Sequence, residues 1–504
     1  MKKLLSLFVC SSCVLPVCAH EKPRPNILLI ITDDLGISDL AAYGNASVCT
    51  PHIDSLADKG VRCTEAYTSS PISGPSRAGI LTGRYQNRFG YEFMPHDHYD
   101  KSFMHSLMWN MLFHHKEVKS MKEMRPSTIR RLNTNLPDTE ITIAELLHNA
   151  GYTTGLVGKW NIGSDLKTIP EEHGYDYSYY FSGALTRYVD DPIDTSRYVN
   201  VHLPWAFSEL PAWQKRSGPT AIRQGHKEVV DTGYLTFSFA EKAIDFIESN
   251  KNNPFFLTLT FNAPHDPFQA PKAYFDRINE KDSVKRVYYA MIEALDDAVG
   301  NVIEALKREN LLDNTLIIFT SDNGGATYTR ATDNAPLAGG KCTLFDGGLR
   351  VPFYIRFPQH LSSVSRVYEQ RISTLDIFST IASVAGVAIP DDRVYDSVDL
   401  RPYLTGQKQE SPHRELFWRN GYVSACIIDN YKLYILKKDR RIFLFNLESD
   451  PSELVNLTDI HPDKVEELKA KLYQWEKAET VKPLWKSRST IRIDVRGEKY
   501  HFPT

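Results

Sequence analysis

Acidic and amide side chains stand directly after two apolar segments of this 504-residue chain. Asp33 and Asp34 follow one segment, and Asp322 and Asn323 follow another almost 300 residues later. Carboxylate and amide oxygens are the ligands that Ca²⁺ and Mg²⁺ prefer, whereas zinc prefers histidine or cysteine. Each pair alone also fits a helix cap or a turn. Brought together by a fold, the four residues predict a site for one divalent cation.

Residues 73–83, SGPSRAGILTG, place a hydroxyl beside a positive charge. Ser73 precedes a short predicted helix, whose first backbone amides favour an anion together with Arg77. A proline- and glycine-rich turn that caps a helix would give the same pattern. An unmodified serine without a partner base is also a poor nucleophile. The segment therefore predicts an anion site at Ser73 and leaves its activation open.

Three further residues could act on an anion or a proton, namely Lys159, His265 and Lys341. Imidazole titrates near neutral pH, which makes His265 a candidate acid, although a histidine after proline can also be a structural residue. Isolated lysines are usually solvated surface residues. Both lysines stand beside glycine at a strand end or in a glycine-rich turn, which favours a site.

Four apolar runs end at these polar residues, at 26–32, 153–158, 255–261 and 315–320. They do not alternate with polar residues, which is typical of strands covered on both faces. Between them, Thr142 to Glu145 has capping-box form, and apolar residues at helical spacing run from 284 to 306. This alternation predicts an α/β fold, doubly wound around a mostly parallel central sheet. Ligands of such folds bind beyond the carboxyl ends of the strands.

The pattern changes after about residue 411. Short antiparallel strands are expected at 425–428, 431–436 and 442–446, and a final helix at 463–477. We therefore predict a catalytic domain of residues 20–411 and a smaller C-terminal α+β subdomain of residues 412–504. Two stretches, roughly 98–138 and 184–230, lack periodicity, and loops of this length are usually lids or binding loops.

The first 19 residues predict a secretory signal peptide. Two lysines precede an apolar run at residues 4–17, which is shorter than the roughly 20 residues of a membrane span. Cleavage is expected after Ala19, and the protein is expected to be exported, to the periplasm. An alternative makes Cys18 a lipid-anchored N-terminus.

Composition excludes several classes of protein. The net charge is −3 and no block of lysine or arginine occurs, which disfavours nucleic-acid binding. No later segment is apolar enough to be a transmembrane span. Beyond the signal peptide, the chain has four cysteines without zinc-site spacing. Export permits a disulfide among them, but the sequence favours no pairing: Cys49, Cys63, Cys342 and Cys426.

The segment at 73–83 resembles the signature of the type I sulfatases, Cys/Ser-x-Pro-Ser-Arg-x-x-x-Leu-Thr-Gly, at every fixed position. Further segments resemble family motifs in the family's order: 26–36, 158–160, 264–265, 321–324, 340–341, 346–350 and 444–457. The resemblance implies an alkaline-phosphatase-like fold and a secreted enzyme that hydrolyses sulfate esters on carbohydrates.

The resemblance also implies that Ser73 is oxidised to formylglycine by a radical-type maturation enzyme. One hydroxyl of the hydrated aldehyde would attack sulfur, and loss of a proton from the other would later expel sulfate. A cation, expected to be Ca²⁺, would hold a sulfate oxygen. Arg77, Lys159 and Lys341 would add positive charge, and His265 would protonate the leaving oxygen.

The chain departs from the family pattern at Asn161, where the family usually has a histidine that contacts formylglycine. Asparagine cannot titrate, so it is assigned only substrate contact, as are His96 and His98, which follow the nucleophile helix. Asp346 replaces the family's usual glutamate. Residues 334–341 resemble bacterial carbohydrate sulfatases and the mammalian N-acetylgalactosamine-4-sulfatase group. A sulfated galactose or N-acetylgalactosamine is therefore the expected substrate.

Two alternatives remain open. A phosphoester or phosphonate hydrolase of the same superfamily is disfavoured, because the chain lacks histidine-rich metal ligands. A catalytically inactive protein that binds sulfated glycans is suggested by Asn161. The sequence does not choose the sugar, the sulfated position, exo or endo action, or the oligomeric state.

Overall fold

The computed structural model describes residues 24–95, 104, 116–118, 134–163, 168–190, 193–203, 215–361, 367–487 and 489–504. The expected signal peptide, His96 and His98 lie outside these residues. No helix within them is long and apolar enough to cross a membrane. The four cysteines named above all lie within them, and no disulfide joins any two of these four in the structure.

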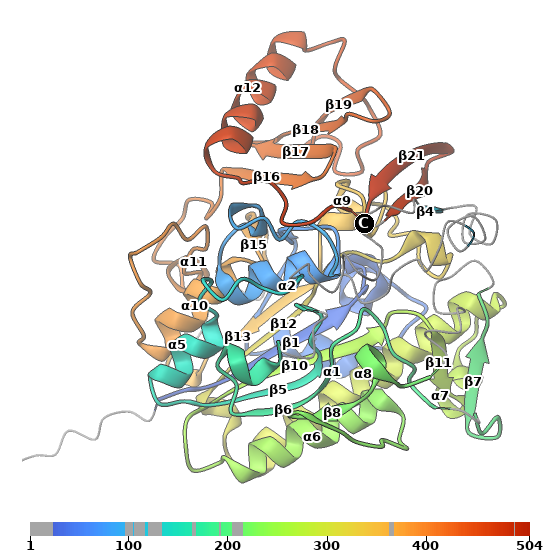
Figure 1. Ribbon diagram of the computed structural model, residues 1–504, viewed down its shortest axis with the longest axis vertical. Helices are drawn as coiled ribbons and strands as arrows, with labels where there is room; N and C mark the ends of the chain where they lie inside the picture. The colour runs from blue at the N-terminus through green and yellow to red at the C-terminus, as the bar shows by residue number, and fades with distance from the viewer. Residues whose placement is uncertain are drawn as a thin grey trace, which may run out of the picture.

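A ten-stranded sheet runs through the larger part of the molecule in the order β14-β2-β13-β12-β1-β10-β5-β6-β8-β9 (Figure 1). Its five middle strands are parallel, namely β12 (Thr315–Ser321), β1 (Asn26–Asp33), β10 (Phe255–Pro264), β5 (Thr153–Lys159) and β6 (Tyr177–Phe181). The outer strands are β14 (Val367–Tyr368), β2 (Val61–Cys63), β13 (Phe353–Arg356), β8 (Arg223–Gln224) and β9 (Lys227–Glu228). Four of the five pairings they add are antiparallel, and only β14 with β2 is parallel. The predicted mostly parallel α/β sheet is confirmed.

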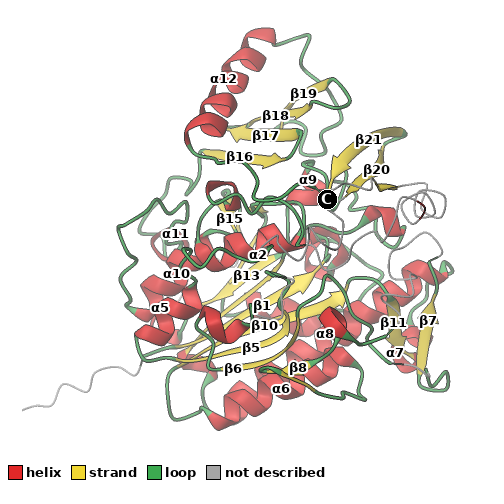
Figure 2. Cartoon of the chain, viewed as in Figure 1, coloured by secondary structure: helices red, strands yellow, loops and turns green. Residues whose placement is uncertain are grey.

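Helices cover both faces of this sheet (Figure 2). Alternate side chains of β1 point into two separate cores, because successive residues of a strand face opposite ways. The first core includes α6 (Leu235–Ser249) and α8 (Ser283–Arg308). The second includes α2 (Ser73–Thr82), α5 (Ile143–Asn149) and α10 (Asp376–Ala385). The doubly wound arrangement is therefore confirmed.

Two helices form where their sequence signals predict them. The Thr142 hydroxyl accepts the Glu145 backbone N–H at 3.1 Å, and the Glu145 carboxylate accepts the Thr142 N–H at 2.7 Å, which completes the capping box of α5. Asp282 caps α8 without a capping box, by accepting the backbone N–H groups of Val284 and Lys285.

A four-stranded antiparallel sheet stands above the main body, with α12 (Pro462–Ala478) against it (Figure 1). It is formed by β16 (Glu415–Asn420), β17 (Val423–Ile428), β18 (Tyr431–Leu436) and β19 (Arg441–Asn446). Three of these strands and the final helix match the sequence prediction, whereas β16 was not predicted. The subdomain boundary at residue 412 stays a prediction.

Short strands lie inside both stretches that lack periodicity. β4 (Lys116–Val118) pairs with the unpredicted C-terminal hairpin of β20 (Ser489–Val495) and β21 (Glu498–Pro503). β7 (Tyr198–Val201) pairs with β11 (Phe268–Pro271). The remaining short elements are β3 (Ala66–Tyr67), β15 (Ile372–Ser373), α1 (Pro51–Asp54), α7 (Lys272–Arg277), α9 (Asp346–Leu349) and α11 (Arg401–Leu404).

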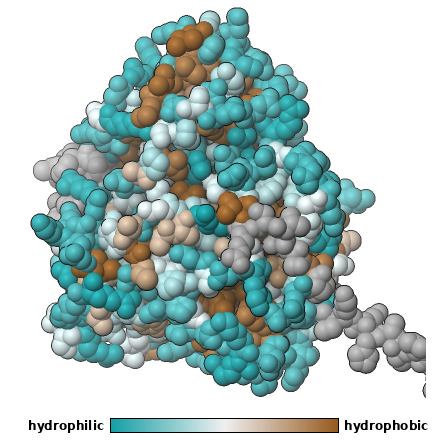
Figure 3. All heavy atoms as spheres, turned by 180° about the vertical axis from the view of Figure 1, so that it is seen from behind, coloured by the Kyte–Doolittle hydropathy of each residue, from teal (hydrophilic) through white to brown (hydrophobic). Residues whose placement is uncertain are grey.

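Apolar side chains gather at the top of the molecule when it is seen from behind, over the C-terminal sheet (Figure 3). The exposed large apolar residues of this subdomain include Ile442, Leu454, Val455 and Ile460. Nothing in the described part of the chain covers them.

Candidate active site

The polar residues that follow β1 and β12 meet at one edge of the central sheet. The two strands are parallel neighbours in register, with Thr32 beside Ser321, so that their carboxyl ends coincide. Asp34 donates its backbone N–H to the Asp322 carboxylate at 3.3 Å. The Asn323 amide donates to Asp34 Oδ1 at 2.7 Å. The structure thus brings together the oxygen donors that the sequence assigned to one cation.

Ser73 lies at the first position of α2 and faces these donors. Its hydroxyl oxygen is 3.2 Å from Asp33 Oδ1 and 3.2 Å from Asn323 Oδ1, and the residue is completely buried. One turn later, Arg77 donates from Nε to Asp322 Oδ2 at 2.8 Å. Its Nη2 is buried and has no hydrogen-bond partner among the described residues.

Two buried lysines add positive charge to the group of acidic residues around Ser73. Lys159 Nζ lies 2.6 Å from Asp33 Oδ2, and Lys341 Nζ lies 2.7 and 2.9 Å from the two oxygens of Asp34. Burial raises the pKa of Asp33, but Lys159 and the other nearby positive groups outweigh burial and hold it below its ordinary value. Burial alone would lower the pKa of Lys341, but Asp34 together with Tyr328 and Asp33 outweighs burial and raises it above its ordinary value.

A glycine places Lys159 at this edge. A Cβ on Gly158 would lie 1.8 Å from the Thr260 carbonyl oxygen of the neighbouring strand, and the residue has φ +114°. Only glycine fits both conditions. The Gly-Lys pair is therefore required by the backbone as well as by the charge of the lysine.

His265 lies at the end of β10 with its ring between two aspartates. Its Nδ1 is 2.6 Å from the Asp266 carbonyl oxygen, which can only accept, so Nδ1 carries a proton. Its Nε2 lies 3.5 Å from Asp34 Oδ2 and faces the site. This orientation leaves Nε2 as the atom that can give or take a proton there.

The residues fit one divalent cation. Asp33, Asp34 and His265 hold ligand atoms within 4.8 Å of one another, and Asp322 and Asn323 add oxygens next to them. Three carboxylates in this group face three cationic side chains, so their charges balance. A divalent ion would therefore make the site net positive, which suits an anionic substrate. Predominantly oxygen donors favour a hard ion such as Ca²⁺.

Asn161 packs beside the start of α2. Its backbone carbonyl oxygen would lie 3.1 Å from a Cβ on Gly74, the residue after Ser73. It adopts φ +53°, which asparagine tolerates better than most residues. Its side-chain oxygen is buried and accepts no hydrogen bond within the described residues. Asn161 thus offers an unused acceptor near the predicted nucleophile.

Sequence reasoning missed Lys432 in the C-terminal sheet and Glu453 in the turn after it, two residues that support the site. Lys432 in β18 is buried and lies 2.6 Å from Asp346 Oδ1 and 2.8 Å from Glu453 Oε1. Asp346 begins α9, and in α9 Gly348 accepts the backbone N–H of Gly324, next to Asn323. No local spacing marks Lys432, because its partners are 86 and 21 positions away along the chain.

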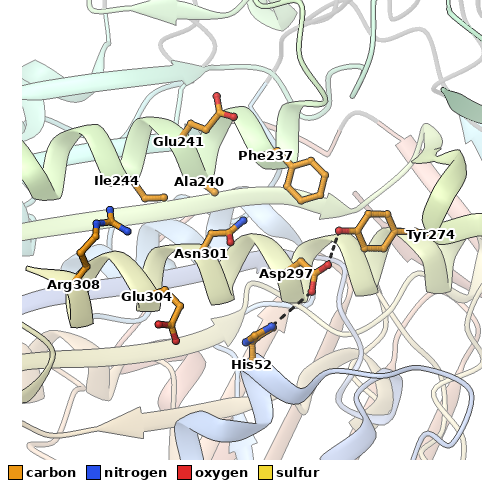
Figure 4. Close-up of a pocket in the computed structure, with 10 residues that line it drawn as sticks. All are labelled: His52, Phe237, Ala240, Glu241, Ile244, Tyr274, Asp297, Asn301, Glu304 and Arg308. Carbon is orange, nitrogen blue, oxygen red and sulfur yellow. Dashed lines mark hydrogen bonds and ion pairs between the residues drawn. The ribbon is translucent and has the colours of Figure 1, made fainter.

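His52 and Asp297 line a groove of about 540 Å³ between α6 and α8 (Figure 4). Together with Asp296 they form a second group of possible metal ligands. Asp296 accepts the backbone N–H groups of His52 and Ile53, which caps α1. Asp297 accepts the Tyr274 hydroxyl at 2.5 Å. Both carboxylates already have structural partners that join α1 and α7 to α8.

Comparison with known proteins agrees with this geometry. The family model described as Sulfatase matches residues 25–387, and that described as N-sulphoglucosamine sulphohydrolase, C-terminal, matches residues 340–479. Steryl-sulfatase from Rattus norvegicus is 32% identical over 468 residues, which cover 81% of this chain and 75% of the relative. N-acetylgalactosamine-6-sulfatase from Sus scrofa is 30% identical over 436 residues, which cover 85% and 74%.

Among solved structures, Ps i-CgsB in complex with k-i-k-neocarrahexaose matches with a TM-score of 0.75 and 29% identity. The match covers 92% of this chain and 94% of that chain. The resemblance inferred from residues 73–83 and the accompanying segments is confirmed, together with the fold it implied. The chain belongs to the sulfatase family and is a sulfuric ester hydrolase.

Proposed function

We propose that this protein is a carbohydrate sulfatase that acts through a formylglycine made from Ser73. The observation that carries the proposal is the position of the Ser73 hydroxyl, 3.2 Å from both Asp33 and Asn323 within a charge-balanced cluster of buried side chains. Support for a sugar substrate comes from the relatives named N-acetylgalactosamine-6-sulfatase and from the structure solved with neocarrahexaose. We propose sulfated galactose or N-acetylgalactosamine as the substrate class.

Oxidation of Ser73 would supply an aldehyde, whose hydrate is a stronger and reversible oxygen nucleophile. The serine points to a radical-type maturation enzyme as a partner. In this proposal the α2 N-terminus and Arg77 orient the sulfate group, since both present N–H donors beside Ser73. The buried and unpartnered Nη2 of Arg77 is the donor left for a sulfate oxygen.

The proposed cation, Ca²⁺, would be held by four residues and would polarise a sulfate oxygen: Asp33, Asp34, Asp322 and Asn323. Lys159 and Lys341 add positive charge at the same edge of the sheet. His265 gives its Nε2 proton to the leaving alcohol oxygen, since its Nδ1 is committed to a backbone carbonyl. Asn161 accepts a hydrogen bond from the nucleophile or the sugar, and takes no proton.

We further propose export to the periplasm after cleavage at Ala19, with lipid anchoring at Cys18 as the alternative. The catalytic domain would then span residues 20–411 and the subdomain residues 412–504. His96 and His98 remain candidates for sugar contact, since they follow the nucleophile helix in sequence.

The test uses full-length protein matured in an anaerobic host with a radical maturation enzyme. Release of inorganic sulfate is measured on a panel of sulfated galactose and N-acetylgalactosamine sugars, with aryl sulfate and aryl phosphate as comparators. We expect sulfate release from at least one sugar and much slower phosphate release. Faster turnover of the phosphate ester would identify a phosphoester hydrolase instead.

An inactive glycan binder is a second candidate, and the unpaired acceptor of Asn161 is the observation that favours it. The matured full-length protein also distinguishes a sulfatase from a glycan binder. Matured protein that binds a sulfated sugar and releases no sulfate would establish the binder, and any catalytic desulfation would eliminate it.

A further inference from the structure

Asp39 is a buried carboxylate outside the ring of groups that faces Ser73. Its Oδ2 accepts the Gly36 backbone N–H at 2.9 Å and lies 2.7 Å from the Tyr288 hydroxyl, and its Oδ1 accepts the Thr332 hydroxyl at 2.8 Å. Burial raises the pKa of Asp39 to about 6, and these three hydrogen bonds oppose the rise by favouring the charged carboxylate. Three donors therefore converge on one charge, and such bonds are stronger than neutral ones.

Thr332 extends this arrangement into the following loop. Its hydroxyl oxygen, which donates to Asp39, also accepts the Asn334 backbone N–H at 3.3 Å. Asn334 adopts φ +55°, and its side-chain oxygen lies over Gly36, where a Cβ would be only 2.3 Å away. The segment after β1 and the loop around residue 334 are thus fitted to each other.

Asn334 in turn fixes the segment that carries Lys341. Its side-chain N–H groups donate to the carbonyl oxygens of Gly325 at 2.9 Å and Gly339 at 3.1 Å. The Lys341 backbone N–H donates to the same Gly325 carbonyl at 3.0 Å. The Lys341 ammonium then reaches Asp34 at 2.7 Å. A continuous chain of contacts leads from Asp39 to the charge beside the predicted metal site.

We propose that Asp39 is a positioning residue for sulfate ester hydrolysis, which fixes Lys341 opposite Asp34 by way of Thr332 and Asn334. It does not touch the reacting atoms. A flexible ammonium contributes to catalysis only where its place is set, because small displacements of a charged group cost large factors in rate. The inference rests on the proposed role of Lys341 in binding the sulfate group.

The test compares Thr332→Val and Asp39→Asn, both close in shape to the native side chains. Asp54→Asn is a matched control, because Asp54 accepts the hydroxyls of Tyr354 and Thr50 in the same pattern away from the site. Rates are normalised to the formylglycine fraction measured by intact mass. We expect kcat to fall about tenfold in the two test variants and by less than about twofold in the control.

A double-mutant cycle separates positioning from general destabilisation. In a Lys341→Ala background, Thr332→Val should change kcat by less than about twofold, because the group it positions is gone. An equal loss in both backgrounds would overturn the proposal, as would wild-type kcat in Thr332→Val. Thr332→Val decides the matter even where Asp39→Asn does not fold. Wild-type kcat in Lys341→Ala alone would instead refute the role of Lys341 and leave the sulfatase assignment intact.

Discussion

At the scale of single residues, the site is built from opposite charges that are all buried. Each cation has a carboxylate partner: Lys159 with Asp33, Lys341 with Asp34, and Arg77 with Asp322. Removal of one member leaves its partner unpaired away from water, which is far more costly than loss of a surface ion pair. Substitutions here should therefore affect stability and turnover together.

Lys159→Met tests this coupling. The substitution keeps the apolar stem but leaves Asp33 uncompensated, so we expect stability to fall by about 3–5 kcal/mol. We also expect kcat to fall by about a hundredfold or more. Urea denaturation and sulfate release measure the two effects. Lys242→Met is the control, because Lys242 pairs with Asp245 at the exposed surface. If Lys159→Met released sulfate at the native rate, Lys159 would have no role in the proposed reaction.

The chemical residues of the site were largely predictable, and the residues that hold them were not. Ser73 and Arg77 stand in one short segment, and Asp33 and Asp322 stand at strand ends, where sequence alone places them at one edge. Asp39 gave no such signal, since its partner Thr332 lies 293 positions away. A local sequence pattern can identify functional residues that lie in one segment. It cannot identify residues whose hydrogen-bond partners lie hundreds of positions away, because only the folded chain brings them together.

At the scale of elements, strands that are continuous apolar runs and helices with regular apolar spacing were predicted from the sequence. Several other elements were missed. Four of the five middle strands, β12, β1, β10 and β5, match the predicted apolar runs, whereas β6 was not predicted. In α8, apolar residues repeat every three to four positions. β20 was missed, although Ile491, Ile493 and Val495 alternate inward. Its pairing with β4 joins segments about 370 residues apart, which no local pattern specifies. β16 is a continuous strand that includes the charged residue Arg419, which pairs with Glu92 from a distant segment.

An ion pair between elements gives a pH-dependent prediction. His413 Nε2 lies 2.8 Å from Asp376 in α10; Asp376 is buried and His413 is partly buried. Burial lowers the pKa of His413, but Asp376 outweighs burial and raises it above the ordinary value. A raised pKa adds stability below the unfolded value of about 6.5, and this stability is lost as pH rises through the folded pKa.

We therefore expect His413→Gln to lower the urea midpoint most at and below about pH 6.5. The difference from the native protein should shrink as the pH becomes alkaline. His461→Gln provides a comparison, because no ion pair of that histidine occurs in the described part of the chain. A difference that grows with pH would show that the ion pair does not stabilise this junction.

At the scale of the whole molecule, the C-terminal sheet and the edge of the central sheet that carries the candidate site are joined by buried contacts. Lys432 joins Asp346 and Glu453, and all three are buried. Lys432→Met would leave two carboxylates facing each other, so we expect a loss of about 3–5 kcal/mol in unfolding free energy. Lys437→Met, at an exposed pair of the same sheet region, should change little. If both substitutions lowered the unfolding free energy equally, the buried ion pairs of Lys432 would not be what stabilises this junction.

Cation binding should also stabilise the whole fold. An ion that binds only the native state adds about 2.7 kcal/mol at a concentration 100 times its dissociation constant. We expect Ca²⁺ to raise Tm over protein treated with chelator, and Asp322→Asn to reduce this shift. Scanning calorimetry measures both. An unchanged Tm across a Ca²⁺ titration of chelator-treated protein would argue against the proposed ligand set.

The most direct measurement relates sulfate release to the state of Ser73. Preparations with different extents of maturation are analysed by intact mass, which detects the loss of two hydrogens, and assayed on one sulfated sugar. We expect the rate to rise in proportion to the oxidised fraction, and to be absent in Ser73→Ala. Sulfate release by Ser73→Ala, or a rate independent of the oxidised fraction, would contradict the central role of this residue.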